Sequence, residues 1–386
     1  MRLLAAAALA FVLAAVPAAA NDRGWTRAFT ASLWQPNESD VVIVEDRTLR
    51  ARIRVNAGGS AIRLWLGNDF AASPVRIGKA TLRTADGRLV PVTFSGQPGT
   101  RIAAGAPLVS DPIPLAVEPF EILEFSLYLP EAATLVGVHD ARADPLEISA
   151  PGDLTGAGQW DAAETRNLRP LFAGIDVLGP QERPVVVAFG DSITDANSCP
   201  HGDPAPCRWS DVLAQRLLAA GKPHVVVNQG IGGNTIVAPV TGPSAQARFD
   251  RDVLAVPGVT HLLLLEGIND VGKSGDTGVT AEELIEAYRQ LTLRAQAHGI
   301  AVIAMTVTPF EGAGYYRPER EVMRDRLNTW IRSSGIFDAV FDMDKIVADP
   351  NDPDRLRADL QVGDNLHPNA AGQRAMGEAI SLSLFD

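Results

Sequence analysis

The stretch from Pro184 to Asp195 reads PVVVAFGDSITD, and its character changes at Gly190. The residues before that glycine form a nearly continuous apolar run, which is typical of a strand buried on both faces of a parallel sheet. The glycine and the aspartate after it favour a tight turn, on which the hydroxyl of Ser192 would be exposed. This stretch therefore predicts a buried strand that places a serine at the carboxyl edge of a sheet, where open α/β proteins bind their ligands.

Similar apolar runs recur farther along the chain, and helical patterns separate them. The runs are His224 to Val227 (HVVV), His261 to Leu265 (HLLLL), Ile300 to Val307 (IAVIAMTV) and Phe337 to Phe341 (FDAVF). Apolar residues at helical spacing mark Ala281 to Ala297, Trp209 to Leu217 and Ala375 to Ile380. This alternation predicts a three-layer, doubly wound α/β fold, with helices on both faces of a parallel sheet.

The residues before about position 175 have the pattern of another fold class. Apolar and charged residues alternate in Thr48 to Val55 (TLRARIRV), and similar patterns occur at Ile62 to Leu66 and Ile122 to Leu129. A period of two is typical of half-buried antiparallel strands, and turn-forming pairs such as Gly58-Gly59 separate the segments. We expect an all-β sandwich of jelly-roll type here.

The chain divides into three segments, with the boundary between the two domains near residues 165–183. We expect a signal peptide at residues 1–20, a β-sandwich domain at 21–180 and an α/β domain at 181–386. The first segment has Arg2 before an apolar run that ends in small residues, which is the pattern of a secretory signal. No other stretch approaches the roughly eighteen apolar residues of a membrane span. We therefore expect a secreted or periplasmic protein without a membrane span.

Charge and cysteine content exclude several classes of function. Removal of Arg2 with the signal peptide changes the formal net charge from −12 to −13, so a polyanion such as nucleic acid would be repelled. The two cysteines, Cys199 and Cys207, are expected to form a disulfide in a protein that leaves the cytoplasm. Two cysteines without an H-E-x-x-H motif provide no zinc site, and we expect neither a metal nor a cofactor.

Residues suited to ester cleavage follow the apolar runs. Ser192 follows the first run, a glycine-rich loop containing Gly233 follows the second, and Asn269 follows the third, whereas Asp364 and His367 lie near the end of the chain. A serine nucleophile needs an adjacent base that a third group orients, and His367 and Asp364 fit these roles. The backbone N–H groups of Ser192 and Gly233 and the side-chain amide of Asn269 would stabilise the oxyanion.

These segments resemble the sequence blocks of a known enzyme family. The motifs GDSI, NxGIGG, GxND and DxxH occur in this order and are similar to the four blocks of the SGNH (GDSL-type) esterase and lipase superfamily. The resemblance covers about residues 184–386 and implies a flavodoxin-like sheet, with Ser192 as nucleophile, Gly233 and Asn269 as oxyanion donors, and His367 and Asp364 as base and carboxylate. The amino-terminal half resembles the β-rich domain that precedes the catalytic domain in a secreted subset of this superfamily. That resemblance assigns no catalytic residue to the amino-terminal half.

Several residues near these motifs have more than one interpretation. His201 lies in the cysteine loop and is a rival base to His367, although only His367 has a carboxylate three residues away. Asp191 and Asp195 either hold the nucleophile loop or Asn269 through hydrogen bonds, or are solvated. The pair Asn269-Asp270 would also suit a helix N-cap.

The other histidines are less suited to catalysis. His224 and His261 begin predicted strands at the opposite end of the sheet, His298 lies at a predicted helix end, and His139 belongs to the β-rich half.

The walls of the substrate site are predicted less directly. Thr308-Pro309-Phe310 and Tyr315-Tyr316 follow the fourth apolar run and either line an acyl or leaving-group pocket or have no such role. The Cys199–Cys207 loop, with Pro200, Pro204 and Pro206, follows the nucleophile, so we expect its disulfide to stiffen the rim of the active site.

The leading hypothesis is a serine esterase that forms an acyl-enzyme, with acetyl esters on carbohydrate as preferred substrates. A lipase or arylesterase is the alternative within the superfamily, and transfer of the acyl group to another alcohol is compatible with the same intermediate. A hypothesis from a different class is a glycan-binding protein, in which Trp25, Trp34 and Trp65 of the β-rich half stack on sugar rings unless they belong to its core.

Overall fold

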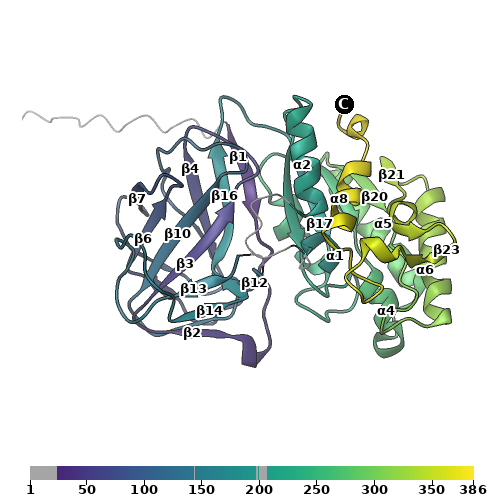
Figure 1. The fold of residues 1–386 in the computed structure, drawn as a ribbon, viewed down its shortest axis with the longest axis horizontal. Helices are drawn as coiled ribbons and strands as arrows, with labels where there is room; N and C mark the ends of the chain where they lie inside the picture. The colour runs from purple at the N-terminus through teal and green to yellow at the C-terminus, as the bar shows by residue number, and fades with distance from the viewer. Residues whose placement is uncertain (1–23, 143, 197–198, 200–206) are drawn as a thin grey trace, which may run out of the picture.

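The computed structural model describes residues 24–142, 144–196, 199 and 207–386 (Figure 1). An antiparallel β half comes first, and an α/β half follows it. The predicted signal peptide lies outside the described residues, as do His201 and the three prolines of the cysteine loop. In the described part of the chain, no helix is long and apolar enough to cross a bilayer.

Two antiparallel sheets form most of the amino-terminal half. The strand order is β1-β16-β4-β9 in one sheet and β14-β13-β3-β10-β6-β7 in the other. Three short pairs, β11-β2, β12-β15 and β5-β8, complete it. The bounds are β1 Trp25–Thr30, β2 Val42–Val44, β3 Arg47–Arg54, β4 Ile62–Gly67, β5 Val75–Ile77, β6 Lys79–Arg83, β7 Leu89–Val92, β8 Thr100–Ile102, β9 Pro107–Val109, β10 Ile122–Leu129, β11 Ala133–Leu135, β12 Val138–Asp140, β13 Leu146–Ile148, β14 Glu164–Arg166, β15 Leu168–Pro170 and β16 Phe172–Leu178, with one short 3-10 turn, η1, at Glu38–Asp40.

The apolar faces of these two sheets pack against each other. On β3 the buried residues Leu49, Ala51 and Ile53 alternate with arginines, as the period of two predicts. Phe125 on β10 and Phe172 on β16 meet in the core, with ring centroids 6.4 Å apart. The prediction of an antiparallel β-rich first half is therefore confirmed.

The carboxyl-terminal half contains a five-stranded parallel sheet with the order β18-β17-β19-β20-β21. Numbered by chain order within this half, the strands run 2-1-3-4-5, which is the flavodoxin-like arrangement. The bounds are β17 Val185–Gly190, β18 Val225–Gly230, β19 Val259–Leu265, β20 Ala301–Met305, β21 Ala339–Phe341, β22 Ala348–Asp349, β23 Asp352–Leu356, α1 Ser192–Asp195, α2 Trp209–Ala219, α3 Ala245–Phe249, α4 Ile268–Thr277, α5 Ala281–Ala297, α6 Pro318–Ser333, α7 Met343–Val347 and α8 Ala370–Ala379, with a π-helical turn η2 at Asp250–Leu254 and 3-10 turns η3 at Ala358–Leu360 and η4 at Leu382–Phe385.

Helices cover both faces of this sheet. The chain moves from β17 to β18 in one direction and from β18 through β19 and β20 to β21 in the other, and right-handed crossovers put the connecting helices on opposite faces. The packing agrees, because α2 contacts α8, whereas α5 contacts α3 and α6. The doubly wound α/β prediction is therefore confirmed.

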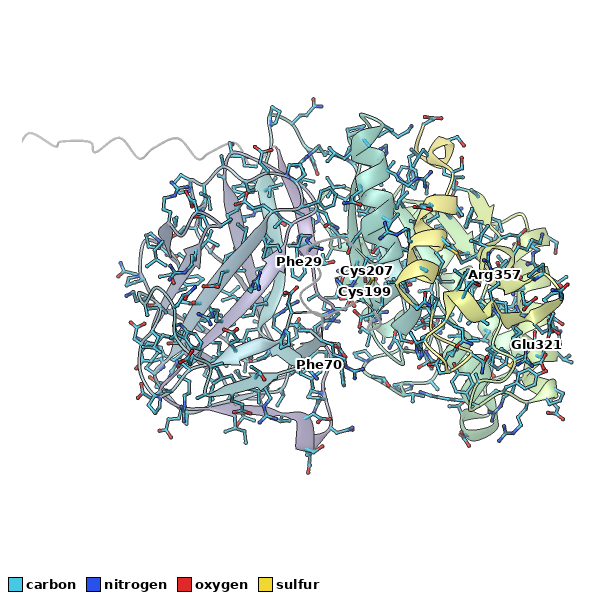
Figure 2. The ribbon with its side chains drawn as sticks, in the orientation of Figure 1. Phe29, Phe70, Cys199, Cys207, Glu321 and Arg357 are labelled. Carbon is cyan, nitrogen blue, oxygen red and sulfur yellow. A yellow bond between two sulfur atoms is a disulfide. The ribbon has the colours of Figure 1, made fainter. Side chains whose placement is uncertain are left out.

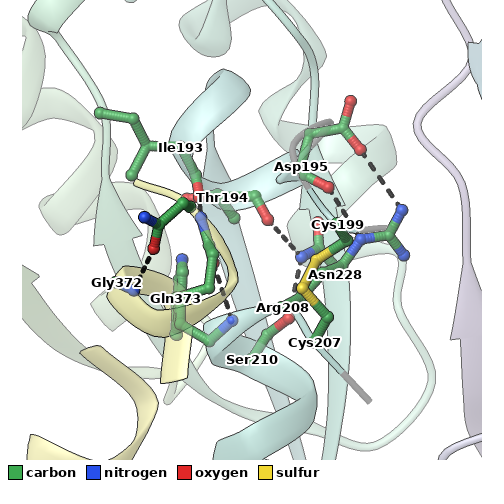
Figure 3. Close-up of a disulfide and its surroundings, with 12 residues drawn as sticks. Ile193, Thr194, Asp195, Cys199, Cys207, Arg208, Ser210, Asn228, Gly372 and Gln373 are labelled. Carbon is green, nitrogen blue, oxygen red and sulfur yellow. Dashed lines mark hydrogen bonds and ion pairs between the residues drawn. A yellow bond between two sulfur atoms is a disulfide. The ribbon is translucent and has the colours of Figure 1, made fainter. Parts of the chain in front are cut away.

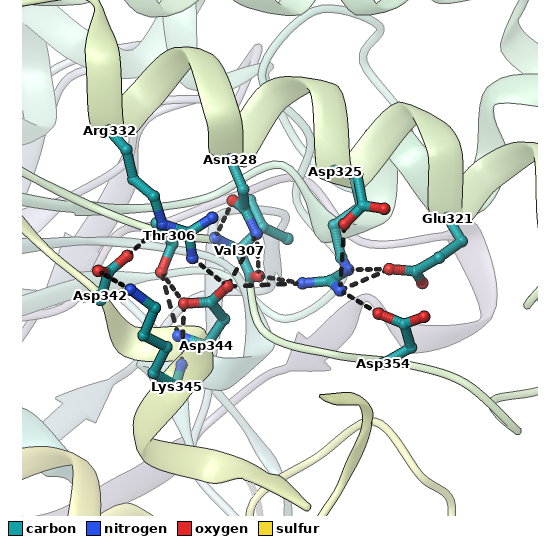
Figure 4. Close-up of polar contacts among 11 residues, drawn as sticks. Thr306, Val307, Glu321, Asp325, Asn328, Arg332, Asp342, Asp344, Lys345 and Asp354 are labelled. Carbon is teal, nitrogen blue, oxygen red and sulfur yellow. Dashed lines mark hydrogen bonds and ion pairs between the residues drawn. The ribbon is translucent and has the colours of Figure 1, made fainter. Parts of the chain in front are cut away.

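Two strand ends differ from the apolar runs that predicted them. β18 continues past its apolar run to Gly230, because Asn228 to Gly230 pair in register with the end of β17. β20 ends at Met305, although its apolar run continues to Val307. The backbone N–H of Thr306 still donates to the carbonyl oxygen of Phe341 at 3.1 Å, but the Asn328 side chain of α6 bonds both backbone groups of Val307, and the strand pairing ends there (Figure 4).

The two halves meet where β1 lies against β18 (Figure 1). The Thr30 hydroxyl donates to the carbonyl oxygen of Asn228 at 2.7 Å, and the Asn56 amide donates to that of Val226 at 2.9 Å. Figure 2 labels Phe29 and the disulfide at this junction. The contact brings the loops after β1 and β12 alongside the carboxyl edge of the parallel sheet. The division at residues 180 and 181 stays a prediction.

Candidate active site

Ser192 lies at the start of α1, immediately beyond the carboxyl end of β17. Gly190 allows the chain to turn there, since a Cβ on it would lie 2.2 Å from the carbonyl oxygen of Leu265 and 2.3 Å from the hydroxyl of Thr194. The Asp191 carboxylate caps α1 by accepting a hydrogen bond from the backbone N–H of Ile193 at 2.9 Å. The serine is therefore presented at the edge between β17 and β19, where the strand order reverses.

Three side chains from distant parts of the sequence meet at this point. Ser192 Oγ lies 2.8 Å from Nε2 of His367, and His367 Nδ1 lies 2.6 Å from Oδ2 of Asp364. An ionised carboxylate only accepts hydrogen bonds, so Nδ1 carries the proton and Nε2 accepts the serine hydroxyl. The structure thus brings together the three residues that the sequence predicts as nucleophile, base and orienting carboxylate.

Asp364 is held in its ionised form by the turn that contains it. Burial alone would raise its pKa, but hydrogen bonds from the backbone N–H of His367, the imidazole of His367 and the backbone N–H of Leu366 outweigh burial, and the pKa of Asp364 is lowered. The carboxylate therefore keeps its charge and favours the imidazolium that forms when His367 takes a proton.

Donors for an oxyanion lie around the same serine. The backbone N–H groups of Ser192 and Gly233 make no hydrogen bond with any described residue, so both are available to a ligand. Gly233 has φ of +75°, and a Cβ there would lie 2.9 Å from the hydroxyl of Thr241, so the loop needs glycine. The Asn269 amide donates one hydrogen to the carbonyl oxygen of Asn234 at 3.0 Å, which fixes its orientation and leaves its other hydrogen unused.

Arg248 on α3 joins the segments that carry these groups. Its guanidinium donates to the carbonyl oxygens of Gly190, the last residue of β17, at 2.9 Å and of Gln229, the next-to-last residue of β18, at 2.7 Å. It also donates to Asn234 Oδ1 at 2.9 Å, the residue that orients Asn269. The side chain is fully buried and stacks on Phe189. No motif in the sequence predicted this role.

Buried carboxyl groups lie beneath the serine. Burial raises the pKa of Asp191 to about 7, and burial together with Asp191 raises the pKa of Glu266 well above its ordinary value. Burial also raises the pKa of Asp270 to about 6, although the backbone N–H groups of Ile236 and Val237 donate to its carboxylate. These two hydrogen bonds attach α4 to the loop that carries Gly233.

A pocket of about 900 Å³ opens over Ser192, and both halves of the molecule line it. The carboxyl-terminal half contributes Ser192, Gly232, Gly233, Thr241, Asn269, Lys273, Tyr315, Val362, Leu366 and His367, and the amino-terminal half contributes Trp34, Asp40, Asp140, Arg142, Asn167 and Leu168. The sequence did not predict that the β-rich half contributes to this pocket.

The structure decides between several of the open interpretations. Asp191 and Asp195 are both buried, so the interpretation that they are solvated is wrong, and Asp191 holds the nucleophile loop. The N-cap of α4 is Gly267, so Asn269-Asp270 is not a cap. Tyr315 lines the pocket, whereas Thr308, Pro309, Phe310 and Tyr316 are absent from the described lining.

None of the other described histidines forms a hydrogen bond with Ser192. His224 directly precedes β18, and His261 lies in β19. Their rings pack against each other with centroids 5.4 Å apart, and both rings also pack against Phe385. His298 Nδ1 lies 2.9 Å from the carbonyl oxygen of Arg294 at the end of α5, as predicted for a helix terminus. His139 lies on β12 of the β-rich half, as predicted, and its Nε2 lies 3.5 Å from Oδ1 of Asp195 on α1.

The disulfide joins Cys199 and Cys207, as the sequence predicts (Figure 3). It connects the end of α1 to the start of α2, where Arg208 donates a hydrogen bond to the carbonyl oxygen of Asp195 at 2.7 Å. Both cysteines line a smaller cavity between the halves, together with Phe29, and neither is among the described residues lining the Ser192 pocket. The bridge braces α1 from the junction, and its effect on the pocket rim stays a prediction.

One group of carboxylates has the spacing of a cation site. Glu321, Asp325 and Asp354 offer oxygens within 4.8 Å of one another. Arg324 already lies among them, with its guanidinium 2.5 Å from Glu321, 3.7 Å from Asp325 and 3.3 Å from Asp354 (Figure 4). A guanidinium therefore already lies between these carboxyl groups.

The geometry agrees with a comparison against known families. The model of the GDSL-like lipase/acylhydrolase family matches residues 188–375. These residues are a GDSL-like lipase/acylhydrolase domain. The match begins within β17 and ends within α8, so this GDSL-like domain includes Ser192, Gly233, Asn269, Asp364 and His367. This domain is accordingly that of a GDSL-family serine esterase or acylhydrolase.

Solved structures similar to this GDSL-like domain share low sequence identity with it. One is a putative lipolytic protein of the G-D-S-L family from Desulfitobacterium hafniense, at 23% identity, over 50% of this chain and 95% of that chain, with a TM-score of 0.39. Another is an acetyl xylan esterase from Geobacillus stearothermophilus, at 22% identity, over 51% of this chain and 92% of that chain, with the same TM-score. A third is a psychrotrophic esterase from a Pseudoalteromonas species, at 21% identity, over 50% of this chain and 92% of that chain, with a TM-score of 0.38. A search of curated proteins found no match.

Proposed function

We propose that the protein hydrolyses short-chain acyl esters, especially acetyl esters of carbohydrate, through an acyl-enzyme on Ser192. The observation that carries this proposal is the line of contacts from Ser192 Oγ through the His367 imidazole to Asp364, at 2.8 Å and 2.6 Å. A hydroxyl hydrogen-bonded to a base that a carboxylate orients is the arrangement that activates serine as a nucleophile.

The proposed reaction has two steps. Ser192 Oγ attacks the ester carbonyl carbon while its proton moves to His367 Nε2, and the oxyanion accepts hydrogen bonds from the N–H groups of Ser192, Gly233 and Asn269. Collapse of this intermediate breaks the ester C–O bond, and the leaving alcohol takes the proton from His367. Water then attacks the acyl-enzyme in the same way, releases the carboxylic acid and restores Ser192.

The lining of the pocket supports a short acyl group and a hydrophilic alcohol. A long acyl chain would need an extended apolar wall, but the aliphatic side chains among the described lining residues are Leu168, Val362 and Leu366. Acetyl esters of sugars place a small acyl group at Ser192 and hydroxyl groups within reach of the polar side chains in the lining, which are Asp40, Asp140, Arg142, Asn167 and Lys273. This supports the carbohydrate esterase over the lipase and arylesterase alternatives.

The alternative of a separate glycan-binding module has less support. The Trp25 ring faces the guanidinium of Arg63, and the Trp65 indole N–H donates to the buried carboxylate of Asp176 at 2.6 Å. Both tryptophans are thus engaged within the β half, and only Trp34 lines the Ser192 pocket. We also propose that the protein acts outside the cytoplasm, because the expected signal peptide and the disulfide both suit an oxidising compartment.

A comparison of ester hydrolysis by the wild type and by Ser192→Ala tests the proposed function. We expect kcat on nitrophenyl acetate and on acetylated xylo-oligosaccharides to fall by about 10⁴ to 10⁶ with the melting temperature unchanged, because the variant lacks the attacking oxygen. The wild type should hydrolyse nitrophenyl acetate faster than the butyrate and octanoate esters. Retained activity in the variant would exclude Ser192 as the nucleophile, and faster cleavage of octanoate would favour a lipase.

A further inference from the structure

The amino-terminal half forms one wall of the Ser192 pocket, and this wall has its own chemistry. Its contributors are Trp34 from the segment after β1, Asp40 from η1, Asp140 and Arg142 at the end of β12, and Asn167 and Leu168 before and within β15. An acetyl group has only two carbons and occupies a small part of about 900 Å³. Most of the pocket is therefore available to the alcohol part of the ester.

Trp34 is held rigidly at this wall. Its backbone forms two hydrogen bonds with Val138, at 2.8 Å and 2.9 Å. Its Cβ lies 2.8 Å from the position that a Cβ on Gly242 would take, so the side chain packs directly on the loop that follows Gly233. Among the described residues its indole N–H has no hydrogen-bond partner, and the ring is only half-buried.

The polar groups of the pocket have unused hydrogen-bonding capacity. Arg142 pairs with Asp140, and its Nε lies 3.1 Å from Oδ2 of Asp140. The other N–H groups of the Arg142 guanidinium are available to a ligand. Lys273 lies one helical turn after Asn269 on α4, and its ammonium has no ion-pair partner within the described residues. Asp40 adds a carboxylate, so the charges of the pocket are mixed rather than strongly positive or negative.

An aromatic face beside several free donors and acceptors suits one class of alcohol. A pyranose ring presents C–H groups to an aromatic face and hydroxyl groups at its edge, whereas an aliphatic or aryl alcohol would leave the polar groups unpaired. We propose that the amino-terminal half forms the alcohol subsite of the esterase, in which Trp34 stacks on the sugar ring that carries the ester. This inference rests on the proposed function and identifies where the sugar binds.

Comparison of a sugar ester with a minimal ester tests the subsite. The two substrates are acetylated xylotriose and ethyl acetate, which carry the same acyl group, and hydrolysis is followed by acid release. We expect Trp34→Leu to lower the ratio of kcat/KM on acetylated xylotriose to kcat/KM on ethyl acetate by about tenfold, and Trp34→Phe to lower it by less than about threefold. The control Trp160→Ala, which removes a tryptophan packed on Arg50 outside the pocket, should keep the wild-type ratio.

The outcomes separate this inference from the proposed function. An unchanged ratio in Trp34→Leu, or equal losses on both esters, would overturn the subsite. Wild-type cleavage of ethyl acetate without cleavage of acetylated xylotriose would overturn the subsite and leave the esterase intact, whereas cleavage of neither would overturn the proposed function.

Binding to an inactive variant provides a second measurement if Trp34→Leu does not fold. We expect acetylated xylotriose to bind Ser192→Ala saturably by calorimetry, and Trp34→Phe in the same background to bind with similar affinity. No binding to Ser192→Ala would contradict the subsite.

Discussion

The two halves of the molecule make different contributions to one pocket. The carboxyl-terminal half provides the groups that react with an ester, and each lies directly after a strand or in a turn beside the sheet edge. The amino-terminal half provides Trp34, Arg142 and their neighbours, which reach the pocket from loops of an antiparallel sandwich. A parallel sheet gathers reactive side chains through its strand order, whereas the sandwich contributes only by docking β1 against β18.

The difference indicates that one part of the chain carries out the reaction and another part determines which alcohol is accepted. Substitutions at the sheet edge should change kcat, because they remove groups used in the transition state. Substitutions in the amino-terminal wall should change the choice of alcohol, because that wall lies beyond the acyl group. The variants below compare the two regions, beginning with the largest expected effect.

The sharpest comparison is between two histidines near α1. We expect His367→Ala to lower kcat by about 10⁴ to 10⁶, because the serine loses its base. His139→Ala removes the imidazole 3.5 Å from Asp195 and should lower kcat by less than about tenfold, since His139 is not among the described residues that line the Ser192 pocket. Steady-state hydrolysis of nitrophenyl acetate measures both, and an equal loss in the two variants would contradict the assignment of the base.

A second comparison concerns two asparagines. Asn269→Ala should lower kcat by about 10² to 10³ with little change in KM, because its amide serves the oxyanion that exists only in the transition state. Asn56→Ala removes a hydrogen bond between the halves, to Val226, and should leave kcat within about threefold. If Asn269→Ala raised KM and kept kcat, its amide would bind substrate instead of the oxyanion.

The disulfide tests how far the junction supports the reactive half. Replacing Cys199 and Cys207 by serine should lower the free energy of unfolding by about 2–3 kcal/mol, because a short closed loop is released. Denaturant unfolding provides the measurement. We expect the rate on ethyl acetate to change by less than about threefold, which corresponds to a change in activation free energy of about 0.5 kcal/mol. A complete loss of activity in a folded variant would show that the bridge shapes the pocket itself.

The last comparison concerns the pH dependence of stability from Asp191. With a pKa of about 7 in the fold, against about 3.9 in an unfolded chain, this carboxyl takes up a proton on folding between these pH values. Its contribution to stability is present below about pH 4 and is lost as the pH rises through about 7.

Asp191→Asn keeps an oxygen that can cap α1 but does not titrate. We therefore expect its melting temperature, relative to wild type, to rise between about pH 5 and about pH 8. Asp161→Asn, at an exposed position, is the control, and its difference in melting temperature from wild type should stay constant over the same pH range. Parallel curves for wild type and Asp191→Asn would contradict the protonated carboxyl.

The sequence was most informative where local chemistry determines the structure. Helix α5 begins and ends at Ala281 and Ala297 as predicted, and a capping box between Thr280 and Glu283 explains its start. Asp364 and His367 were predicted from their spacing, because one turn places both side chains together. Ser192, Gly233 and Asn269 were predicted because the ends of parallel strands meet at one edge.

The remaining features depend on packing between distant segments. Trp34 lines the pocket only because β1 docks on β18, and no local pattern distinguishes it from Trp25 or Trp65. Arg248 lies within an ordinary helical segment, and its hydrogen bonds to three separate segments follow from the sheet order. His139 belongs to the β-rich half as predicted, and its contact with Asp195 on α1 follows from how the two halves pack.

Labelling with a serine-directed phosphonate tests the central claim most directly. The account predicts that one phosphonyl group per chain becomes attached to Ser192, identified by peptide mass spectrometry, and that esterase activity falls in proportion to this attachment. His367→Ala should be labelled far more slowly, because the hydroxyl is no longer activated. Attachment to a different residue, or full activity after Ser192 is modified, would contradict the account.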